Sequence, residues 1–297
     1  MPEAALLASA RLGLALAFGL GAILGSFLNV VAHRLPLELS VVRPGSRCPA
    51  CRTPVRPIDN VPILSWLLLA GRCRGCHGRI SVRYALVELL SGLLAVGAFL
   101  VLVAEPGRVA DGHAWARWAV VLAVTSALLA ASLIDLDHRI LPDEITKPGM
   151  WAGPAVCAFV PELVLGPARA APSWLPGGLP TAVQAASVSA VGVAVGAGVI
   201  WGLGVVGTRL FKKEAMGFGD VKFLGFIGGF VGPVGALLAL VLAAFVGAVA
   251  GLVRWLATRD RYIPFGPFLA VGGYVELLYG RTALDWYLDT LSAALRG

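Results

Sequence analysis

Long uncharged stretches alternate with short polar segments along this chain of 297 residues. The first stretch, residues 12–32, has 21 residues and no charged side chain. About 20 apolar residues are enough for a helix to cross the hydrocarbon core of a bilayer. Comparable stretches, with at most one charged residue each, follow at 84–104, 115–134, 148–166, 181–208 and 263–280. The pattern therefore predicts a series of membrane-spanning helices.

The longest uncharged run covers residues 223–253 and counts 31 residues. This length is too great for one straight span and short for a helical hairpin. Its glycines and proline, which membrane helices tolerate, are expected to break it into a short helix and a complete one. The breaking residues are Gly228, Gly229, Gly232 and Pro233. We therefore expect an all-α polytopic membrane protein with about eight transmembrane helices, or seven if this run is one tilted helix.

Composition agrees with a membrane protein and excludes a soluble one. Hydrophobic residues make up 58% of the chain and charged residues only 14%, whereas soluble domains contain about 25% charged residues. A soluble fold of this size could not bury so much apolar surface, so lipid must cover it. The lipid bilayer is therefore an expected partner, and nucleic acid is not.

The whole net charge of +7 lies in residues 32–83, where nine arginines stand against Glu38 and Asp59. Basic loops stay on the cytoplasmic side of a membrane, so this segment is expected there, with the N-terminus outside. A secretory signal is the alternative for the first stretch, but the stretch is too long and a large basic loop follows it. The expected domains are a first transmembrane helix at 1–32, a small cytoplasmic four-cysteine zinc domain at 33–83 and a membrane core at 84–297.

Four of the five cysteines lie in the basic segment, as two C-x2-C pairs separated by 21 residues: Cys48 with Cys51, and Cys73 with Cys76. Each pair places two thiolates on one tight turn, and two such turns facing one another make a tetrahedral zinc site. Disulfides are the alternative, but cytoplasmic thiols stay reduced. Because all four ligands come from the protein, the zinc would be structural. The fifth, Cys157, is expected to be a small buried hydrophobe.

Two aspartates at predicted span ends are candidate catalytic groups, because charges within spans are costly and usually functional. Asp135 should lie at the cytoplasmic end of the third span and Asp220 at that of the sixth, which puts both at the same membrane depth. Two neighbouring carboxylates hold one proton between them. Such a pair can activate water for peptide hydrolysis, one acid acting as base and the other as acid. A solvated helix cap is the alternative, above all for Asp137, Asp143 and Glu144.

The motifs around these aspartates occur together with other distinctive stretches. Gly217-Phe-Gly-Asp220 has the pattern GxGD, and Ile134-Asp135 is followed by Leu141-Pro142-Asp143. Residues 25–31, 60–66, 83–88 and 264–268 complete the set. In this order, and with the cysteine tetrad, the chain resembles the type IV leader peptidase family, the bacterial prepilin peptidases among the GxGD intramembrane aspartyl proteases. The resemblance covers nearly the whole chain.

The resemblance implies two reactions at the cytoplasmic face of the bacterial inner membrane. The first is removal of the basic leader of type IV prepilins or type II secretion pseudopilins, with Asp135 and Asp220 as the catalytic dyad and the four cysteines binding zinc. The second is methylation of the newly exposed amino terminus, with S-adenosylmethionine as methyl donor. The methyltransferase residues are sought among polar groups in and near the basic segment: Asn29, Asp59, Asn60 and Glu88. Glu88 is equally explained as an acid near a helix N-terminus, where the dipole favours negative charge.

Three other functions are alternatives. A peptidase without methyltransferase activity would lack the cysteine loop, and a proton-coupled membrane transporter would place its acids in the middle of spans. A zinc-bearing assembly factor without enzymatic activity would leave the two aspartates idle. Because the basic segment would repel a basic leader, leader recognition is expected at the acidic residues between 135 and 144.

Overall fold

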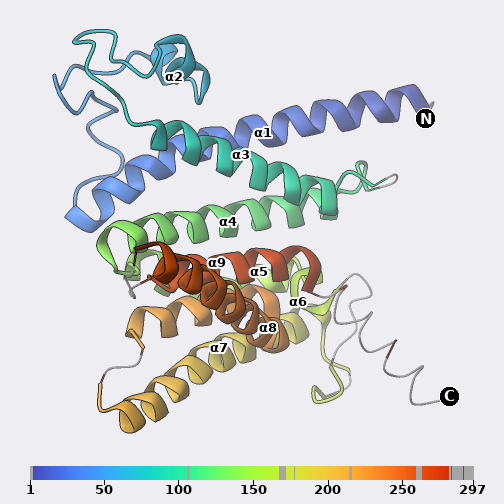
Figure 1. The fold of residues 1–297 in the computed structure, drawn as a ribbon. Helices are drawn as coiled ribbons and strands as arrows, with labels where there is room; N and C mark the ends of the chain where they lie inside the picture. The colour runs from blue at the N-terminus through green and yellow to red at the C-terminus, as the bar shows by residue number, and fades with distance from the viewer. Residues whose placement is uncertain are drawn as a thin grey trace. The chain divides into compact units, whose positions relative to one another are not determined.

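The computed structural model describes residues 3–105, 108–166, 172–176, 178–213, 216–258 and 263–280, together with Thr282 and Thr290. Within these ranges the regular structure is helical apart from two isolated β-bridges (Figure 1). The chain divides into two compact units, Met1–Ile134 and Asp135–Gly297. The prediction of an all-α protein is confirmed for the described residues.

The first unit is built on two long helices, α1 (Glu3–Arg34) and α3 (Val82–Leu102), which pack side by side in Figure 1. A Cβ on Gly21 would lie 2.6 Å from that of Ala95, and one on Gly25 would lie 2.8 Å from the Cα of Glu88. Small residues four positions apart are typical of closely packed membrane helices. The third helix, α4 (Gly112–His138), contacts α3 through Trp118, whose indole N–H donates to the carbonyl of Ala95 at 3.1 Å.

The segment between α1 and α3 has little regular structure. Its elements are two 3-10 turns, η1 (Leu35–Leu37) and η2 (Pro57–Asn60), and the short helix α2 (Leu64–Leu68). The remaining backbone forms the turns that carry the four cysteines. Turns of this kind bury little apolar surface, so contacts between polar groups and cysteines must hold them.

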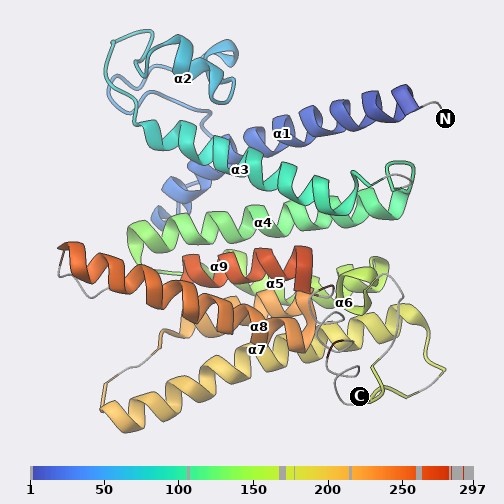
Figure 2. The ribbon, with the colours of Figure 1, turned by 45° about the vertical axis from the view of Figure 1, so that its right-hand side comes forward.

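The second unit contains α5 (Asp143–Phe159), α6 (Glu162–Leu165), α7 (Thr181–Phe211), α8 (Phe218–Thr258), α9 (Gly266–Val275) and the π-helical turn η3 (Glu276–Gly280). Figure 2 shows α7 and α8 side by side. A Cβ on Gly192 would lie 2.1 Å from the carbonyl oxygen of Gly228, and one on Gly196 would lie 2.5 Å from that of Leu224. These glycines let the two backbones approach closely, as small residues do between membrane helices.

α8 is broken inside the long uncharged run, as the sequence predicts. Gly232 has φ 76° and ψ 179°, which are not helical values, and only glycine adopts them without strain. Pro233 follows and has no N–H, so the carbonyl of Gly229 loses its partner within the helix. The Ser189 hydroxyl and the Cys157 thiol donate to that carbonyl instead. The prediction of a short helix followed by a long one is therefore confirmed.

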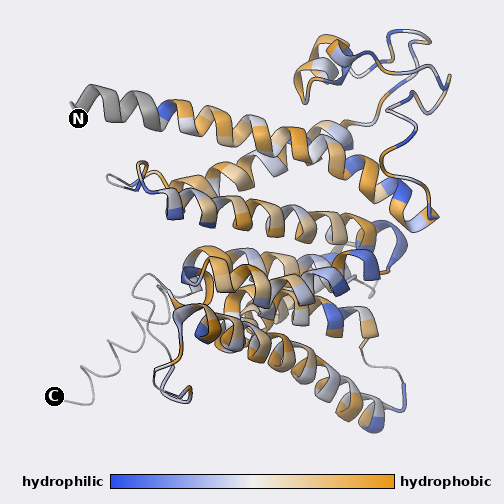
Figure 3. Ribbon diagram, turned by 180° about the vertical axis from the view of Figure 1, so that it is seen from behind, coloured by the Kyte–Doolittle hydropathy of each residue, from blue (hydrophilic) through white to orange (hydrophobic). Residues whose placement is uncertain are grey.

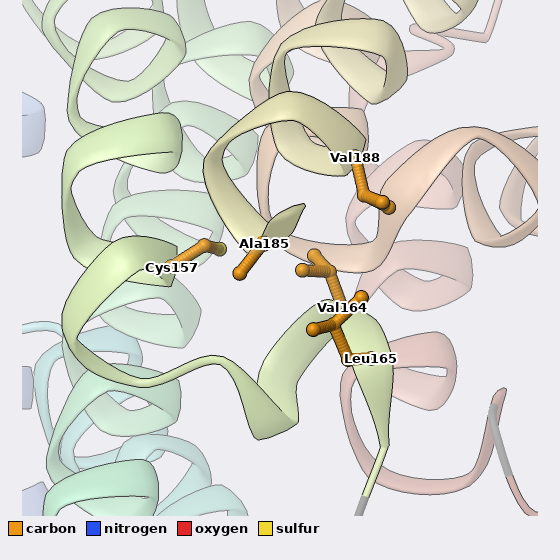
Figure 4. Close-up of a cluster of buried hydrophobic side chains, with 5 residues drawn as sticks. All are labelled: Cys157, Val164, Leu165, Ala185 and Val188. Carbon is orange, nitrogen blue, oxygen red and sulfur yellow. The ribbon is translucent and has the colours of Figure 1, made fainter. Parts of the chain in front are cut away.

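Cys157 lies in a small apolar cluster, as expected for a buried hydrophobe (Figure 4). Its side chain has no exposed surface, and α6 and α7 supply its neighbours. The cluster consists of Cys157, Val164, Leu165, Ala185 and Val188. These contacts fix the ends of α5, α6 and α7 next to the break in α8.

Among the described residues, five helices are long and apolar enough to cross a membrane: Arg11–Leu37, Val82–Leu102, Gly112–His138, Thr181–Leu210 and Phe218–Ala257. Figure 3 shows apolar residues running along these helices. The stretches expected to span at 148–166 and 263–280 hold shorter helices, α5 with 17 residues and α9 with 10. Pro161 comes two residues after the end of α5 at Phe159, and a proline cannot continue a helix without losing a hydrogen bond. The count of eight spans stays a prediction.

Candidate functional sites

The four cysteines of the basic segment come together in the first unit. Their Sγ atoms all lie within 4.8 Å of one another. The Sγ of Cys48 lies 3.8 Å from that of Cys76, and the Sγ of Cys51 lies 4.0 Å from that of Cys73. A disulfide bond would be about 2.05 Å long, whereas thiolates about 2.3 Å from one tetrahedral zinc ion lie about 3.8 Å apart. The cluster therefore has the geometry of a four-thiolate metal site.

Both cysteine pairs lie on the same kind of turn. The N–H of Arg52 donates to the carbonyl of Cys48 at 2.9 Å, and the N–H of His77 donates to that of Cys73 at the same distance. Arg52 and His77 each follow the second cysteine of a pair and have left-handed backbones, with φ of 58° and 54°. Each turn is closed by an isolated β-bridge. Backbone hydrogen bonds give the two turns the same conformation. In the sequence, this similarity is visible mainly as the equal C-x2-C spacing of the two cysteine pairs.

Hydrogen bonds prepare part of the cluster for a cation. Bonding with the side chain and then the backbone of Thr53 lowers the pKa of Cys51 to about 6, and backbone hydrogen bonds also lower the pKa of Cys73. The backbone of Gly78 acts to lower the pKa of Cys76, but hydrogen bonds with the neighbouring thiols and burial outweigh it and raise the pKa to about 11. Two of the thiols thus favour the thiolate, which is the form that binds metal.

A cavity of about 600 Å³ lies beside this cluster and reaches to α1 and α3. Its walls include all four residues that the sequence offers as methyltransferase candidates. They are Asn29 on α1, Asp59 and Asn60 on η2, and Glu88 on α3. Residues from three separate elements therefore face one hollow, next to the cysteine turns.

Asp59 in the cavity wall is held by a bidentate ion pair. The guanidinium of Arg74 donates from Nε to Oδ2 at 2.9 Å and from Nη2 to Oδ1 at 2.7 Å. This pairing lowers the pKa of the Asp59 carboxyl. Because Arg74 lies between Cys73 and Cys76, the ion pair ties the second cysteine turn to η2.

Glu88 holds a strained turn in the same wall. Its Oε2 accepts a hydrogen bond from the N–H of Ile63 at 2.7 Å, and its side chain is buried. Ile63 has φ 63° and ψ −53° and is the centre of a γ-turn closed from Leu64 to Pro62. Such a conformation is rare, and for a β-branched residue it is a genuine outlier. Glu88 therefore stabilises a specific backbone turn and is more than an acid near a helix terminus.

Asp135 and Asp220 come together in the second unit. Asp135 lies in the last turn of α4 and Asp220 in the first turn of α8, and the charge of Asp135 acts on Asp220. Asp135 is buried, and its Oδ2 accepts a hydrogen bond from the N–H of Gly266 at 3.0 Å. The Asp220 carboxylate takes a backbone hydrogen bond at Gly217, as acids in a first helical turn do when they reach back to the capping residue. Both acids therefore lie at helix termini, as expected: Asp135 at the end of α4 and Asp220 at the start of α8.

Leu141 packs between two glycines that flank these acids. A Cβ on Gly219 would lie 3.1 Å from the Cβ of Leu141. A Cβ on Gly266 would lie 3.1 Å from Cδ2 of Leu141 and 2.6 Å from Oδ2 of Asp135. No side chain therefore fits at Gly266 unless the aspartate moves. Reasoning from the sequence missed both roles, although Leu141 and Gly266 stand in the similar stretches noted above.

Asp143 opens α5 and binds two lysines. The Nζ of Lys147 lies 2.6 Å from Oδ2, and the Nζ of Lys222 contacts Oδ1. The two ammonium groups, Lys147 first, hold the pKa of Asp143 below its usual range. The sequence suggested this acid as part of a surface for a basic leader, but its charge is balanced within the protein.

Comparisons with known proteins show which family the sequence belongs to. Residues 20–102 match the family model of the bacterial peptidase A24 N-terminal domain, and residues 122–252 match that of the type IV leader peptidase family. A protein from Aeromonas salmonicida is 35% identical, over 93% of this chain and 94% of its own length. The chain belongs to the type IV leader peptidase family.

Two further relatives are similar to this chain over comparable lengths. One from Stutzerimonas stutzeri is 36% identical, over 91% of this chain and 92% of its own, and one from Pseudomonas aeruginosa is 33% identical, over 91% of each. All three relatives are named prepilin leader peptidase/N-methyltransferase. No solved structure matches the chain. The N-terminal match contains the four cysteines, and the leader peptidase match contains both aspartates.

Proposed function

We propose that this chain is a bifunctional membrane enzyme that removes the leader of type IV prepilins or pseudopilins and then methylates the new amino terminus. The names of the relatives support both activities. The observation that carries the peptidase is the convergence of Asp135 and Asp220 from the ends of α4 and α8 onto a site bordered by glycine backbone. The four-cysteine cluster and its cavity support the second activity.

Asp135 and Asp220 form the catalytic dyad. One carboxylate is ionised and takes a proton from water, whose oxygen attacks the carbonyl carbon of the peptide bond. The other is protonated and gives its proton to the carbonyl oxygen, so that the tetrahedral intermediate is neutral. The C–N bond then breaks, the amine leaves with the proton taken from water, and the second acid recovers its own proton. Gly217, Gly219 and Gly266 allow a substrate main chain to come close, since they carry no side chain.

The dyad is tested with full-length protein in detergent micelles and a purified type IV prepilin. Asp135→Asn and Asp220→Asn should each abolish leader cleavage, because an amide cannot exchange the proton. Asp111→Asn, an exposed aspartate before α4 whose cap hydrogen bond from the N–H of His113 an asparagine can keep, is the matched control and should cleave normally. Cleavage by either dyad variant at the wild-type rate would overturn the assignment.

The four cysteines are proposed to bind one structural zinc ion. Their number, their spacing and the distances between Sγ atoms fit a closed tetrahedral site, which leaves no position for substrate. Metal analysis of the purified protein should give about one zinc per chain, the stoichiometry of a four-thiolate site. Cys73→Ser should lose that zinc, whereas Cys157→Ser should keep it. An unchanged zinc content in Cys73→Ser would contradict the site.

The cavity is proposed to hold S-adenosylmethionine, which supplies the methyl group when bound. Its volume of about 600 Å³ lies within the range of about 300–1,000 Å³ that is usual for small-molecule sites. The side-chain amides of Asn29 and Asn60 offer donors and acceptors for a polar ligand. Asp59 and Glu88 stabilise the wall of the cavity by accepting hydrogen bonds, Asp59 from Arg74 and Glu88 from the N–H of Ile63.

Binding of the methyl donor can be measured apart from activity. Titration of the full chain with S-adenosylmethionine should show one site, and Asn60→Ala should weaken binding while leader cleavage continues. Asn60 has no part in the dyad, so loss of both activities would indicate misfolding. An affinity unchanged in both Asn29→Ala and Asn60→Ala would place the donor elsewhere.

The enzyme is proposed to lie in the inner membrane with eight spans, its cysteine cluster and dyad on the cytoplasmic side. The arginine surplus of residues 32–83 supports this orientation. In intact cells a membrane-impermeant maleimide should label Asp111→Cys, in the loop before α4, and should not label Lys212→Cys, after α7. Labelling of Lys212→Cys would contradict the proposed orientation.

A further inference from the structure

An ion pair joins the two chain segments that carry the proposed catalytic carboxylates. Asp143 lies at the start of α5, eight residues after Asp135, and Lys222 lies on α8, two residues after Asp220. The Nζ of Lys222 donates to Oδ1 of Asp143. We propose that Asp143 and Lys222 are positioning residues that set the separation of the Asp135 and Asp220 carboxylates. The proposal rests on the peptidase function proposed above.

The path from Asp135 to Asp143 is short and fixed by hydrogen bonds. α4 ends at His138, and the next residue, Arg139, has a left-handed backbone and donates its N–H to the carbonyl of Asp135 at 2.9 Å. The carbonyl of Pro142 accepts from both the N–H and the hydroxyl of Thr146, each at 3.1 Å. Thr146 is fully buried. A shift of Asp143 would therefore carry the end of α4 with it.

Leu141 transmits the same constraint through packing. It stands in this path and lies against Gly219 on α8 and Gly266 on α9. A residue that bridges both helices can keep its place only while α8 stays close to the start of α5. The ion pair between Asp143 and Lys222 is the contact between charged groups that joins α8 to the start of α5.

The path from Lys222 to Asp220 is a single rigid helix. Both residues lie in the first two turns of α8, which the backbone hydrogen bonds of the helix keep together. The Nζ of Lys222 lies 5.0 Å from the ring centroid of Phe218, and its side chain is only 20% exposed. A cation placed over an aromatic ring and shielded from water is held more firmly than a surface lysine.

Lys147 binds the same carboxylate as Lys222 but does not link two helices. It binds Oδ2 of Asp143 at 2.6 Å, but it lies one turn further along α5 and is 58% exposed. Ion pairs four residues apart on one exposed helix face contribute little to stability, and this one cannot connect two helices. Removing Lys147 deletes a charge next to Asp143 and leaves the link between α5 and α8 intact, so it is the matched control for Lys222.

The test compares cleavage kinetics of full-length variants in detergent micelles with a purified type IV prepilin. Lys222→Ala should lower kcat roughly tenfold, below the hundredfold that a 1 Å misplacement can cost, with KM within about twofold. Lys147→Ala should match the wild type. Lys222→Arg should recover most of the rate, because a guanidinium can still reach Asp143.

A double-mutant cycle separates the ion pair from either residue alone. Asp143→Asn should show the same loss as Lys222→Ala, and the double variant should lose no more than each single one, since both remove one interaction. Equal losses in Lys147→Ala and Lys222→Ala, losses that multiply in the double variant, or a wild-type kcat in Lys222→Ala would each overturn the proposal.

Unfolding and failure of the underlying function can both be recognised. If Lys222→Ala does not fold, as judged by gel filtration and thermal unfolding, Asp143→Asn and Lys222→Arg carry the comparison. A wild-type protein that leaves the prepilin uncut would refute the proposed peptidase function. A wild-type protein that cleaves, beside a Lys222→Ala variant that cleaves equally fast, would refute only the positioning role.

Discussion

The backbone N–H of Gly266 donates to Oδ2 of Asp135 at 3.0 Å, across 131 positions of sequence. A backbone donor neither titrates nor changes rotamer, so it fixes one carboxylate oxygen of the proposed dyad at every pH. We therefore expect proton exchange with substrate to use Oδ1. Because Gly266 begins α9, the position of this helix decides how Asp135 faces Asp220.

Gly266→Ala should impair cleavage although it adds only one methyl group. The new Cβ would lie 2.6 Å from Oδ2 of Asp135, so either the carboxylate or the helix must move. A displacement of this kind should lower kcat at least about tenfold. Gly198→Ala on α7 is the control, because a Cβ there meets nothing within 4 Å. Equal rates for the two variants would show that the close approach of Gly266 to Asp135 has no catalytic importance.

The sequence predicts those parts of the site that depend on side-chain chemistry and spacing. Asp135 and Asp220 were placed at helix ends by charge and hydropathy, and the four cysteines were paired by their spacing. Gly266 could not be found in this way, because any residue carries a backbone N–H and only the fold shows that this one faces Asp135. The ion pair between Asp143 and Lys222 was missed for a similar reason. It joins two helices, and the hydropathy of the sequence does not specify which helices pack together.

The same distinction holds for the fold. The break in α8 was predicted at the correct residues because Gly232 and Pro233 have intrinsic backbone limits. The end of α5 was expected too late, because the apolar stretch at 148–166 continues past Phe159, where this helix ends. Hydropathy records the surroundings of a segment, whereas hydrogen bonding decides where its helix stops.

Ser189→Ala should destabilise the protein without touching either proposed active site. The hydroxyl of Ser189 donates to the carbonyl of Gly229, which Pro233 leaves without a helical partner. Leaving a buried carbonyl with only the weak thiol donor of Cys157 should cost about 1–2 kcal/mol in the free energy of unfolding. Denaturant unfolding in mixed micelles measures this.

Ser187→Ala is the matched control for that experiment. Ser187 lies on the same helix, is half-buried, and donates to the carbonyl of Val183 in its own helix. Its removal should change the free energy of unfolding by less than about 0.5 kcal/mol, as is usual for surface positions. If the two variants unfold at the same denaturant concentration, the hydrogen bond from Ser189 to the carbonyl of Gly229 does not stabilise the break in α8.

The pH dependence of stability should reveal the ion pairs of Asp143. Lys147 and Lys222 lower the pKa of this carboxyl in the folded protein, so the pairs stabilise the fold fully above the unfolded pKa of about 3.9. That contribution is lost as the pH falls through the lower folded value. The difference in thermal midpoint between wild type and Asp143→Asn should therefore be constant between about pH 5 and 8 and shrink below about pH 4. A difference that changes across neutral pH would contradict this assignment.

Glu88 should matter for methyl transfer through the turn that it holds. Its Oε2 accepts the N–H of Ile63, whose γ-turn is strained and stands in the wall of the cavity with Asn60. Glu88→Ala leaves that N–H without its acceptor and frees the turn to relax. We expect Glu88→Ala to lower the affinity for S-adenosylmethionine and the rate of methylation at least about tenfold, the equivalent of 1.4 kcal/mol, with leader cleavage unchanged.

Glu88→Gln distinguishes this role from a charge effect. The amide oxygen of glutamine can accept the same hydrogen bond, so methylation should be largely kept if Glu88 acts on Ile63. If Glu88 instead acts as a negative charge near the start of α3, or contacts the donor as a carboxylate, glutamine should fail as badly as alanine. Methylation that survives in Glu88→Gln and fails in Glu88→Ala would show that the carboxylate serves the γ-turn, because only the acceptor oxygen is common to glutamate and glutamine.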